Sequence, residues 1–409
     1  MKDKVIFHMD GDAFFVACEI AKNPLLKGLP VVTGEERGIV SALSYEAKAL
    51  GIKRGFPIFK LKKEFPSVLV LAGDYKSYAE YSQKMFDIVR RYADIVEEYS
   101  IDECFADLTG LNKPLYMTYR QIAERIKFEV TEELGLSVSV GIAPSKVLAK
   151  VASKHHKPNG FTEINLQTKD KYLSETPIEK IWGIGRRTSE FLKTKKIETA
   201  LDFVKKDLEW VRGNLAKPYE VIWHELSGTS IMQVSGEAKS SYHSIQKTRT
   251  FYPPTSDETF LLSQISKHIE EASRKARHFG LVPQKINFFL KTQNFKYFSY
   301  DLSLPVPTNA PEVLIYLVRK YFKKVYSRFS LYRTTGVTLY ELTPESKRQL
   351  DLFGENEVND RFEIIHKQID VLEEKFGKKM VYLASTHNAR LQKQKGTDSD
   401  DLDRDLLFL

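Results

Sequence analysis

The chain contains only two cysteines, Cys18 and Cys104, among its 409 residues. Two thiols cannot build the disulfide framework of a small secreted protein or a cysteine-based zinc site. The sequence also lacks an apolar run of about 18 residues, the length that a membrane-spanning helix requires. It begins with the strand-like segment Val5-Ile6-Phe7 and shows no secretory leader. These absences point to a reducing cytoplasm and exclude a membrane partner.

An excess of basic residues is the main compositional feature that remains. The chain has 62 Lys and Arg against 54 Asp and Glu, which leaves a formal net charge of +8. This balance suits a polyanionic partner, although a merely soluble basic protein has the same composition. With 42% hydrophobic residues, the chain can bury real cores, and its length predicts two or more domains.

Three acidic residues lie in apolar, β-branched surroundings, where an unpaired charge is costly. Asp10 ends a predicted buried strand and precedes Gly11, which lets the backbone approach an ion closely. Asp102 and Glu103 lie in a predicted β-hairpin over residues 95–108. Oxygen ligands without histidine or cysteine select Mg²⁺ or Mn²⁺, and two such ions commonly serve phosphoryl transfer.

The adjacency of Asp102 and Glu103 constrains this interpretation. On a regular strand, neighbouring side chains point to opposite faces, so both reach one ion pair only at a turn or bulge. Ser100 favours such a bend. The alternative is a surface hairpin tip with two solvated acids. Asp12 also lies nearby, but we expect it to cap a helix that starts at Ala13.

Nucleotide binding also needs cationic and hydroxyl donors for phosphates. Tyr45 and Lys48 are three residues apart in a predicted helix and therefore share one face. Lys157 lies in a polar loop and offers a point charge suited to phosphate. Taken singly, each lysine is more often an ordinary solvated residue.

The predicted elements change in kind along the chain. An α/β sheet domain, interrupted by residues 14–73, comes first, and a helical region follows over 174–232. Residues 243–343 show the order strand, helix, strand, strand, helix, strand, which is the split βαβ arrangement. In the tail, an apolar stripe over 358–376 predicts one helix, which docks on its own protein more often than on a partner. Residues 380–384 are compatible with a strand, and disorder is predicted from residue 386.

Five motifs occur together in a familiar order and spacing. They are the run at 8–15, Ser-Tyr-Glu-Ala-Lys at 44–48, Ser-Ile-Asp-Glu at 100–103, Gly-Ile-Ala-Pro-Ser-Lys-Val-Leu-Ala-Lys at 141–150, and Lys-Pro-Asn-Gly at 157–160. With them, the chain resembles the Y-family translesion DNA polymerases over residues 1–343. The resemblance implies an α+β multidomain right-hand polymerase. Its parts would be a palm (1–13 and 74–167), fingers (14–73), a helix-hairpin-helix thumb (168–232), a linker (233–242), a βαββαβ little finger (243–343), and a clamp-binding tail (344–409) with one helix and a disordered end.

The resemblance also implies roles for individual residues. Asp10, Asp102 and Glu103 would be catalytic and hold two Mg²⁺ ions, with Mn²⁺ as an alternative and the Gly11 carbonyl as a backbone ligand. The implied dNTP-binding residues are Phe14, Phe15, Ser41, Tyr45, Lys48 and Lys157. Phe15 would be the sugar gate, because a bulky ring leaves no room for a 2′-hydroxyl. Many family members have Arg where this chain has Lys48, and Thr in place of Ala42, so a bidentate phosphate contact is lost and Ser41 is left to supply a hydroxyl.

The resemblance further implies binding partners. Gly183, Gly185 and Arg186 would contact the DNA backbone at a helix N-terminus, and Lys247 and Arg249 would contact it from a sheet face. Aromatic residues on the little-finger strands are expected to be core. The implied partners are primer-template DNA, dNTPs, the sliding clamp and damage-response accessory subunits, for a monomer at the bacterial nucleoid. The clamp-binding peptide would comprise Gln349, Leu350, Leu352 and Phe353.

Two questions of class stay open at this point. The tail resembles the catalytic subunit of bacterial polymerase V, whereas Tyr45 fits the polymerase IV branch. A nucleotidyl cyclase with a palm-type fold would use similar acids, but it has no need of a little finger or a clamp peptide. An inactive DNA-binding scaffold would have lost the acids, which are present here. We therefore predict a DNA-templated DNA polymerase for translesion synthesis, of low fidelity and without proofreading.

Overall fold

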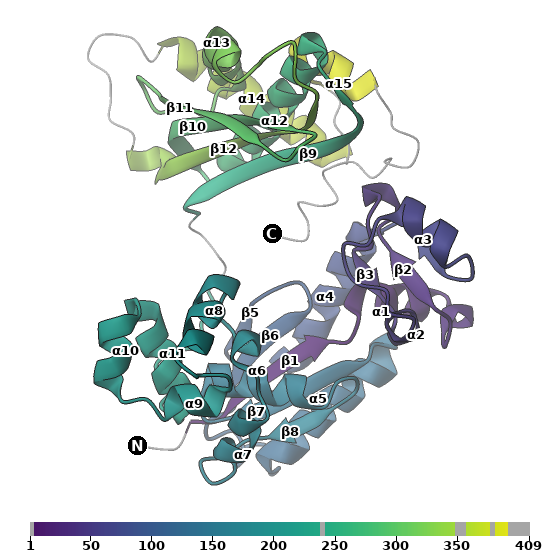
Figure 1. Cartoon of the computed structure of the whole chain (residues 1–409), viewed down its shortest axis with the longest axis vertical. Helices are drawn as coiled ribbons and strands as arrows, with labels where there is room; N and C mark the ends of the chain where they lie inside the picture. The colour runs from purple at the N-terminus through teal and green to yellow at the C-terminus, as the bar shows by residue number, and fades with distance from the viewer. Residues whose placement is uncertain (1–3, 238–241, 348–356, 377–380, 392–409) are drawn as a thin grey trace. The chain divides into compact units, whose positions relative to one another are not determined.

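The computed structural model describes residues 4–237, 242–347, 357–376 and 381–391 (Figure 1). These residues form two compact units that divide within the predicted linker, 233–242. No helix in the described ranges is long and apolar enough to cross a membrane.

The first unit is built on a five-stranded mixed sheet with the strand order β5-β6-β1-β7-β8. The central strand β1 pairs antiparallel with both neighbours, β6 and β7. The pair β5–β6 is the hairpin that the sequence predicts, and β8 runs parallel to β7. The strands are β1 (Ile6–Gly11), β5 (Val96–Glu98), β6 (Glu103–Asp107), β7 (Val138–Ala143) and β8 (Phe161–Glu163).

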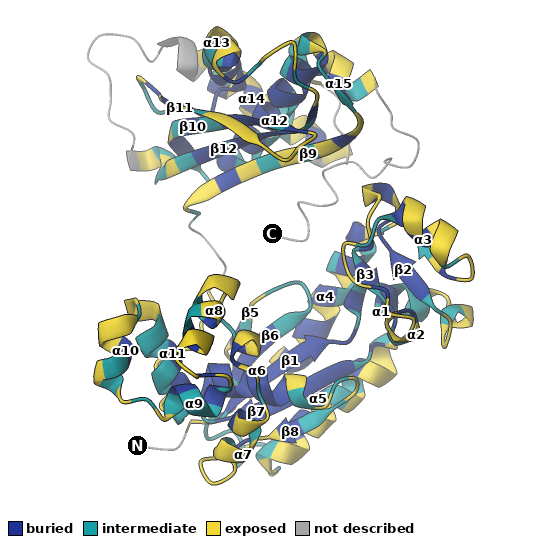
Figure 2. Cartoon of the chain, viewed as in Figure 1, coloured by how far each residue is buried: buried dark blue, intermediate teal, exposed yellow. Residues whose placement is uncertain are grey.

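Strand β1 is buried along its whole length (Figure 2), and its side chains alternate between two helical layers. Phe7 and Met9 join the core formed with α4 and α5. His8 lies on the opposite face and contacts Ser153 of α6 through a 2.7 Å hydrogen bond. Asp10, two residues further, shares that face. The helices are α4 (Tyr75–Arg90), α5 (Tyr119–Leu134) and α6 (Lys146–His155).

Glycine brings α6 unusually close to this sheet. A Cβ at Gly141 of β7 would lie 2.4 Å from the carbonyl oxygen of Ala149 and 2.4 Å from the backbone nitrogen of Ser153. Any larger residue would push the helix away. The acidic side chains at the end of β1 therefore lie directly beneath the side chains of α6.

A small three-stranded sheet, in the order β3-β2-β4, forms most of the segment between β1 and α4. The Ser44 side chain caps α2 by accepting a hydrogen bond from the Ala47 backbone at 3.1 Å. The elements are α1 (Phe14–Lys22), β2 (Val31–Thr33), β3 (Ala42–Leu43), α2 (Tyr45–Ala49), α3 (Ile58–Glu64) and β4 (Leu69–Leu71).

Short helices make up the rest of the first unit, as predicted for 174–232. Thr199 caps α9 and forms a capping box with Asp202. Beyond the helices, Ser235 donates its backbone N–H to Glu97 at 3.0 Å, and Gln233 accepts from Lys146. Side chains of α6 and β5 thus bind two residues of the segment predicted as a flexible tether. The helices are α7 (Lys169–Ser174), α8 (Arg186–Thr194), α9 (Ala200–Val204), α10 (Leu208–Asn214) and α11 (Lys217–Ser227).

The second unit is a four-stranded sheet in the order β11-β10-β12-β9, with every neighbouring pair antiparallel. Strands β9 and β10 are consequently parallel to each other with β12 between them, which is the predicted split βαβ arrangement. Helices α12 and α13 share its core. The elements are β9 (Ser244–Thr255), α12 (Glu258–His278), β10 (Leu281–Thr292), β11 (Tyr297–Ser303), α13 (Pro311–Tyr321) and β12 (Tyr332–Pro344).

The tail departs from its prediction. Helix α14 (Glu357–Phe376) is present, but a second helix, α15 (His387–Leu391), follows where disorder was expected. Residues Ala384–Thr386 form a 3-10 turn, so the predicted strand over 380–384 is wrong. A five-residue helix has too little periodicity to be recognised, and tertiary contacts stabilise this one: the Ala389 backbone donates to the Ser263 hydroxyl of α12 at 2.9 Å. The predicted clamp peptide lies outside the described residues.

Candidate active site

The three predicted acids meet at the end of β1. Asp10 and Glu103 are paired across β1 and β6, so their side chains project from the same face. Asp102 lies in the bend just before β6, where its carbonyl accepts the Gly11 N–H at 2.8 Å and its carboxylate accepts the Ser100 hydroxyl at 2.6 Å. The predicted bend is thus present, and it frees Asp102 from the alternation of the strand.

Two lysines neutralise these acids. Lys157 forms an ion pair with Asp10 and lies 3.5 Å from Asp12, while Lys150 of α6 lies 2.7 Å from Glu103. Within the described ranges, no three acidic, histidine or cysteine side chains are grouped so as to hold a metal ion as they stand. The donor set nevertheless fits Mg²⁺, because it consists of carboxylates without histidine or cysteine. The lysine ammonium groups lie beside the carboxylates where a cation would bind.

Burial and mutual contact shift the pKa values of the acids. Burial raises the pKa of Asp10 to about 7, helped by its hydrogen bond with Glu103 and opposed by Lys157. Burial also raises the pKa of Asp102, against the hydrogen bond from Ser100. It acts on Glu103 too, but hydrogen bonds from Asp10 and Lys150 outweigh it and lower the pKa of Glu103 to about 2. Burial thus favours a proton on Asp10, whereas the contacts with Asp10 and Lys150 favour an ionised Glu103, a divergence typical of reactive carboxylate pairs.

Asp12 does not cap the following helix, contrary to the prediction. Helix α1 begins after Ala13, which adopts a left-handed conformation (φ 49°) and receives no side-chain cap. This turn directs the buried Asp12 carboxylate toward β7, where it accepts hydrogen bonds from Ser137 and Ser139 at 2.8 and 2.9 Å. The Asn159 backbone donates to it at 2.7 Å. Asp12 thus holds the loop that carries Lys157.

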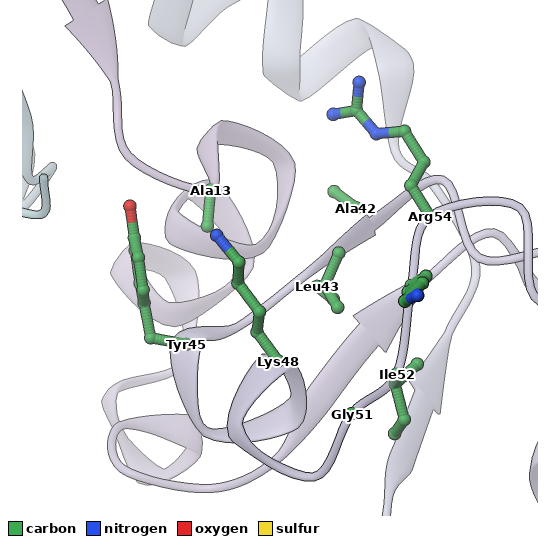
Figure 3. Close-up of a pocket in the computed structure, with 9 residues that line it drawn as sticks. Ala13, Ala42, Leu43, Tyr45, Lys48, Gly51, Ile52 and Arg54 are labelled. Carbon is green, nitrogen blue, oxygen red and sulfur yellow. The ribbon is translucent and has the colours of Figure 1, made fainter. Parts of the chain in front are cut away.

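A cavity of about 520 Å³ is lined by residues of β3, α2 and the segment after α2 (Figure 3), and Tyr45 on its wall interacts with Asp12 and Asp10. Lys48 and Tyr45 both line it, and the Lys48 ammonium lies 5.7 Å from the centre of the Tyr45 ring. In Figure 3 the Lys48 side chain points toward Ala13, whereas Arg54 points away from it. The lining residues are Ala13, Ala42, Leu43, Tyr45, Lys48, Gly51, Ile52, Lys53 and Arg54.

The remaining predicted nucleotide ligands are dispersed around this cavity. Phe14 belongs to the core, whereas the half-buried Phe15 stacks on Tyr78 with ring centres 4.6 Å apart. The Ser41 hydroxyl is hydrogen-bonded to Thr33 at 2.9 Å. Lys157 is engaged with the acids.

Sequence reasoning assigned no role to Lys150, Lys53 or Arg54. Lys150 belongs to a motif that carried the family resemblance, and its position four residues after Lys146 indicates a shared helical face. Lys53 and Arg54 come two and three residues after Gly51, which has a positive φ, and both line the cavity. Only the fold shows that Lys150 pairs with Glu103 and that Lys53 and Arg54 line the cavity.

The predicted DNA-contacting turn lies before α8. Gly183 adopts φ +89°, a conformation that favours glycine. A Cβ at this position would also lie only 2.7 Å from the Ile222 side chain, so both the backbone and the packing require glycine. Gly185 is the N-cap of α8 and provides no side chain to satisfy the first N–H groups. Arg186 is highly exposed and pairs with Glu190 at 2.8 Å.

Lys247 and Arg249 lie on the edge strand β9, opposite Val337 and Thr335. This is the sheet face that carries Ile245 and the helical layer, rather than the open face. The aromatic residues also differ from their prediction. Phe288 and Phe289 are buried, but three others at the β10–β11 hairpin are 60%, 61% and 43% exposed: Phe295, Tyr297 and Phe298. The hairpin tip offers them no second layer to pack against.

Comparison with known proteins adds independent observations. A model of the impB/mucB/samB family matches residues 9–154, and a model of that family's C-terminal domain matches residues 242–352. The chain is 30% identical to DNA polymerase IV of Desulfatibacillum aliphaticivorans over 92% of this chain and 95% of the relative. It is 29% identical to DNA polymerase IV 1 of Bacillus subtilis strain 168, over 97% of this chain and 96% of the relative.

Solved structures give the same result. A Y-family DNA polymerase chimera of Dbh and Dpo4 matches with a TM-score of 0.69 and 25% identity, covering 83% of this chain and 99% of the other. A Dbh ternary complex matches with a TM-score of 0.55 and 26% identity, with the same coverage.

Paired carboxylates at the ends of two inner strands, near a cavity with basic side chains, are the arrangement of an enzyme that transfers nucleotidyl groups. The relatives specify which enzyme. The chain belongs to the Y family of translesion DNA polymerases, in the DNA polymerase IV branch, and is a DNA-directed DNA polymerase. The similarity to polymerase IV extends through the tail that resembled polymerase V.

Proposed function

We propose that this polymerase copies damaged DNA by two-metal nucleotidyl transfer from a dNTP to the primer 3′-hydroxyl. The observation that carries the proposal is the convergence of Asp10, Asp102 and Glu103 beside the cavity lined by Tyr45 and Lys48. When bound, the two ions activate the 3′-hydroxyl and neutralise phosphate charge. The three carboxylates and the Gly11 carbonyl would hold them.

The phosphate-binding residues act by charge and position. Lys48 presents its ammonium to the cavity next to Tyr45, whose burial keeps the phenol neutral by raising its pKa, helped by the charges of Asp12 and Asp10. Lys157 pairs with Asp10 in the absence of metal. If Asp10 held a cation, its charge would be compensated without Lys157, and the Lys157 ammonium would be left to bind the triphosphate.

Phe15 is proposed as the sugar gate. Its ring stacks on Tyr78 and meets Tyr75 edge-on, so neighbouring rings restrict its rotation. A fixed ring excludes a 2′-hydroxyl by steric clash more effectively than a mobile one.

DNA and the sliding clamp are the proposed macromolecular partners. The Dbh structures are described as ternary complexes, which supports binding of DNA and nucleotide by the shared fold. Gly183, Gly185 and Arg186 would contact the DNA backbone from the thumb, and Lys247 and Arg249 from the little finger. The peptide at 349–353 would recruit the clamp.

Primer extension on undamaged and lesion-containing templates tests the enzyme proposal. Asp102→Asn should reduce Mg²⁺-dependent extension about a hundredfold or more, because one oxygen ligand loses its charge. Asp107→Asn is the matched control, since Asp107 lies in the same hairpin but pairs with Lys4. Absence of extension by the unmutated protein, or equal loss in both variants, would contradict the proposal.

Low fidelity without proofreading is proposed from family membership alone. A primer with a mismatched 3′-end, incubated without dNTPs, should keep its length.

A further inference from the structure

Two buried lysines of α6 lie inside an aromatic enclosure next to the acidic centre. Lys146 and Lys150 are 4% and 5% exposed. The Lys150 ammonium lies 4.2 Å from the centre of the Tyr99 ring and 5.0 Å from that of Trp182, and it donates to Glu103 at 2.7 Å. Aromatic faces stabilise a cation held away from water, so this enclosure fixes the ammonium that contacts Glu103.

Trp182 enters the enclosure from the thumb. It lies in the turn that ends at Gly185, directly before the glycine with positive φ. Its indole stacks on Phe105 with ring centres 5.6 Å apart and donates its Nε1–H to the Tyr99 hydroxyl at 2.9 Å. Phe105 and Tyr99 flank the acids in the β5–β6 hairpin. One side chain therefore connects the turn before α8 to the hairpin that carries Glu103.

We propose that Trp182 is a positioning residue that couples the DNA-contacting turn of the thumb to Glu103 through Lys150. The inference rests on the proposed roles of Glu103 in catalysis and of the Gly183–Gly185 turn in DNA contact. When DNA holds the turn, the indole confines the Lys150 ammonium, and the ammonium holds the carboxylate in one orientation. Without the indole, water reaches Lys150, and Glu103 samples unproductive orientations.

A purely structural role of Trp182 makes a different prediction. If the indole only packs the thumb against the sheet, its loss weakens folding or DNA affinity and leaves the maximal rate unchanged. If Trp182 is coupled to Glu103, its loss should instead lower the extension rate at saturating substrates and leave the affinity for DNA nearly unchanged. The two roles are therefore separable by kinetics.

The principal test makes two measurements. The rate of primer extension is measured in single turnovers, and the affinity for DNA is measured by fluorescence anisotropy without divalent cations. Trp182→Leu should lower the maximal rate about tenfold, which corresponds to about 1.4 kcal/mol of activation free energy. The Kd for DNA should stay within about twofold of that of the unmutated protein. Trp182→Phe keeps a ring over Lys150 and should recover most of the rate. Trp210→Leu is the matched control, because Trp210 is a thumb indole with its own lysine, Lys206, at 5.7 Å. A change in Kd alone, or the same rate loss in Trp210→Leu, would overturn the coupling.

A double-variant cycle covers the case in which Trp182→Leu perturbs the fold. Lys150→Met removes the link itself, so adding Trp182→Leu to it should cost no further rate. Multiplicative losses would show that Trp182 acts without Lys150 and would overturn the inference.

A readout that does not depend on activity uses the three tryptophans of the chain, Trp182, Trp210 and Trp223. With Trp210→Phe and Trp223→Phe, the emission reports on Trp182 alone. Primer-template DNA in EDTA should change this emission, and unchanged emission would argue against contact between DNA and the turn.

If the unmutated protein shows no Mg²⁺-dependent extension, the proposed function fails. If it extends primers and Trp182→Leu does so equally fast, only the coupling fails.

Discussion

Lys157 and Asp10 form an ion pair at the position where metal ions are proposed to bind. A buried carboxylate must be neutralised by a proton, a lysine or a metal ion, and these three compete. Asp10 has both a raised pKa and a lysine partner, so metal binding has to displace one or the other. Metal binding to the protonated form of Asp10 would release a proton, whereas binding to the ionised form would displace only Lys157.

The pH dependence of the Mg²⁺ requirement tests this competition. The pKa of Asp10 is raised to about 7, so the carboxyl is protonated below that pH in the metal-free protein. Because Mg²⁺ needs the ionised form, the half-saturating Mg²⁺ concentration should fall as pH rises toward 7 and then level off. Below pH 7 the change should approach tenfold per pH unit at most. Mg²⁺ titrations of primer extension between pH 6 and 8 measure it. His155→Gln, which removes a histidine outside the acidic centre, should show the same profile; a flat profile in the unmutated protein would contradict the assignment.

Phe15 allows a test of sugar selectivity. Phe15→Ala should raise ribonucleotide incorporation relative to deoxynucleotides by about a hundredfold, because the clash with the 2′-hydroxyl disappears. Phe15→Tyr keeps the bulk and serves as the control. Competitive incorporation assays with rNTP and dNTP give the ratio, and unchanged selectivity in Phe15→Ala would remove Phe15 from the sugar gate.

At the scale of elements, the strand pairing β6-β1-β7 brings two of the proposed catalytic acids together. Asp10, Glu103 and Ser139 are register partners, although more than ninety residues separate the first two in sequence. The approach of α6, which requires Gly141, then places Lys150 over Glu103. A shift of β6 by one residue would turn Glu103 to the α4–α5 face and separate it from Asp10.

The turn before α8 gives a stability prediction at this scale. Gly183→Ala should destabilise the first unit by about 1 kcal/mol or more, because alanine is strained at φ +89°. Gly185→Ala should cost less, since its φ is ordinary and a Cβ meets open space, and only the preference of an N-cap for glycine over alanine is lost. Thermal unfolding monitored by circular dichroism compares the two. Equal destabilisation would show that the positive φ of Gly183 is not the cause.

Helix α14 shows how an amphipathic pattern can mislead. Its apolar stripe predicts a face buried against the protein, yet Ile365, Leu372 and Phe376 are 52%, 40% and 52% exposed. Ion pairs dock the neighbouring face instead: Arg274 with Glu373 at 2.5 Å and Arg277 with Asp370 at 2.6 Å. The pattern therefore correctly predicts a helix but not the side that packs.

At the scale of the whole molecule, the polymerase divides into a unit that carries the acidic centre and a second unit with the four-stranded sheet. Each has its own hydrophobic core. The proposed clamp peptide, 349–353, belongs to the sequence span of the second unit and lies outside the described residues.

Deletion of residues 349–353 tests the clamp hypothesis. Clamp-stimulated synthesis should be lost while basal synthesis is retained, because the tether only raises the effective concentration of polymerase on clamp-loaded DNA. Primer extension with and without loaded clamp measures both quantities. Deletion of an equal length from 392–396 is the control. Equal loss of stimulated and basal synthesis would count against a clamp role.

The sequence alone determined the main elements, the split βαβ order and the family. Local periodicity and motif spacing encode these directly, as with the capped helix at Thr199 and the bend at Asp102. It did not determine the partner of Asp12, the burial of Phe288 against the exposure of Phe295, or the docking of α15. Each of these features depends on which segment, distant in sequence, packs against the residue or helix in question.

The acidic centre shows the same division. The presence of Asp10, Asp102 and Glu103 and their preference for a hard cation follow from residue types and spacing. Their pairing with Lys157 and Lys150, and the enclosure that joins Glu103 to Trp182, arise only when β1, β6, α6 and the thumb pack together. Charges and aromatic rings interact over a few ångströms in space, and sequence separation carries no information about that distance.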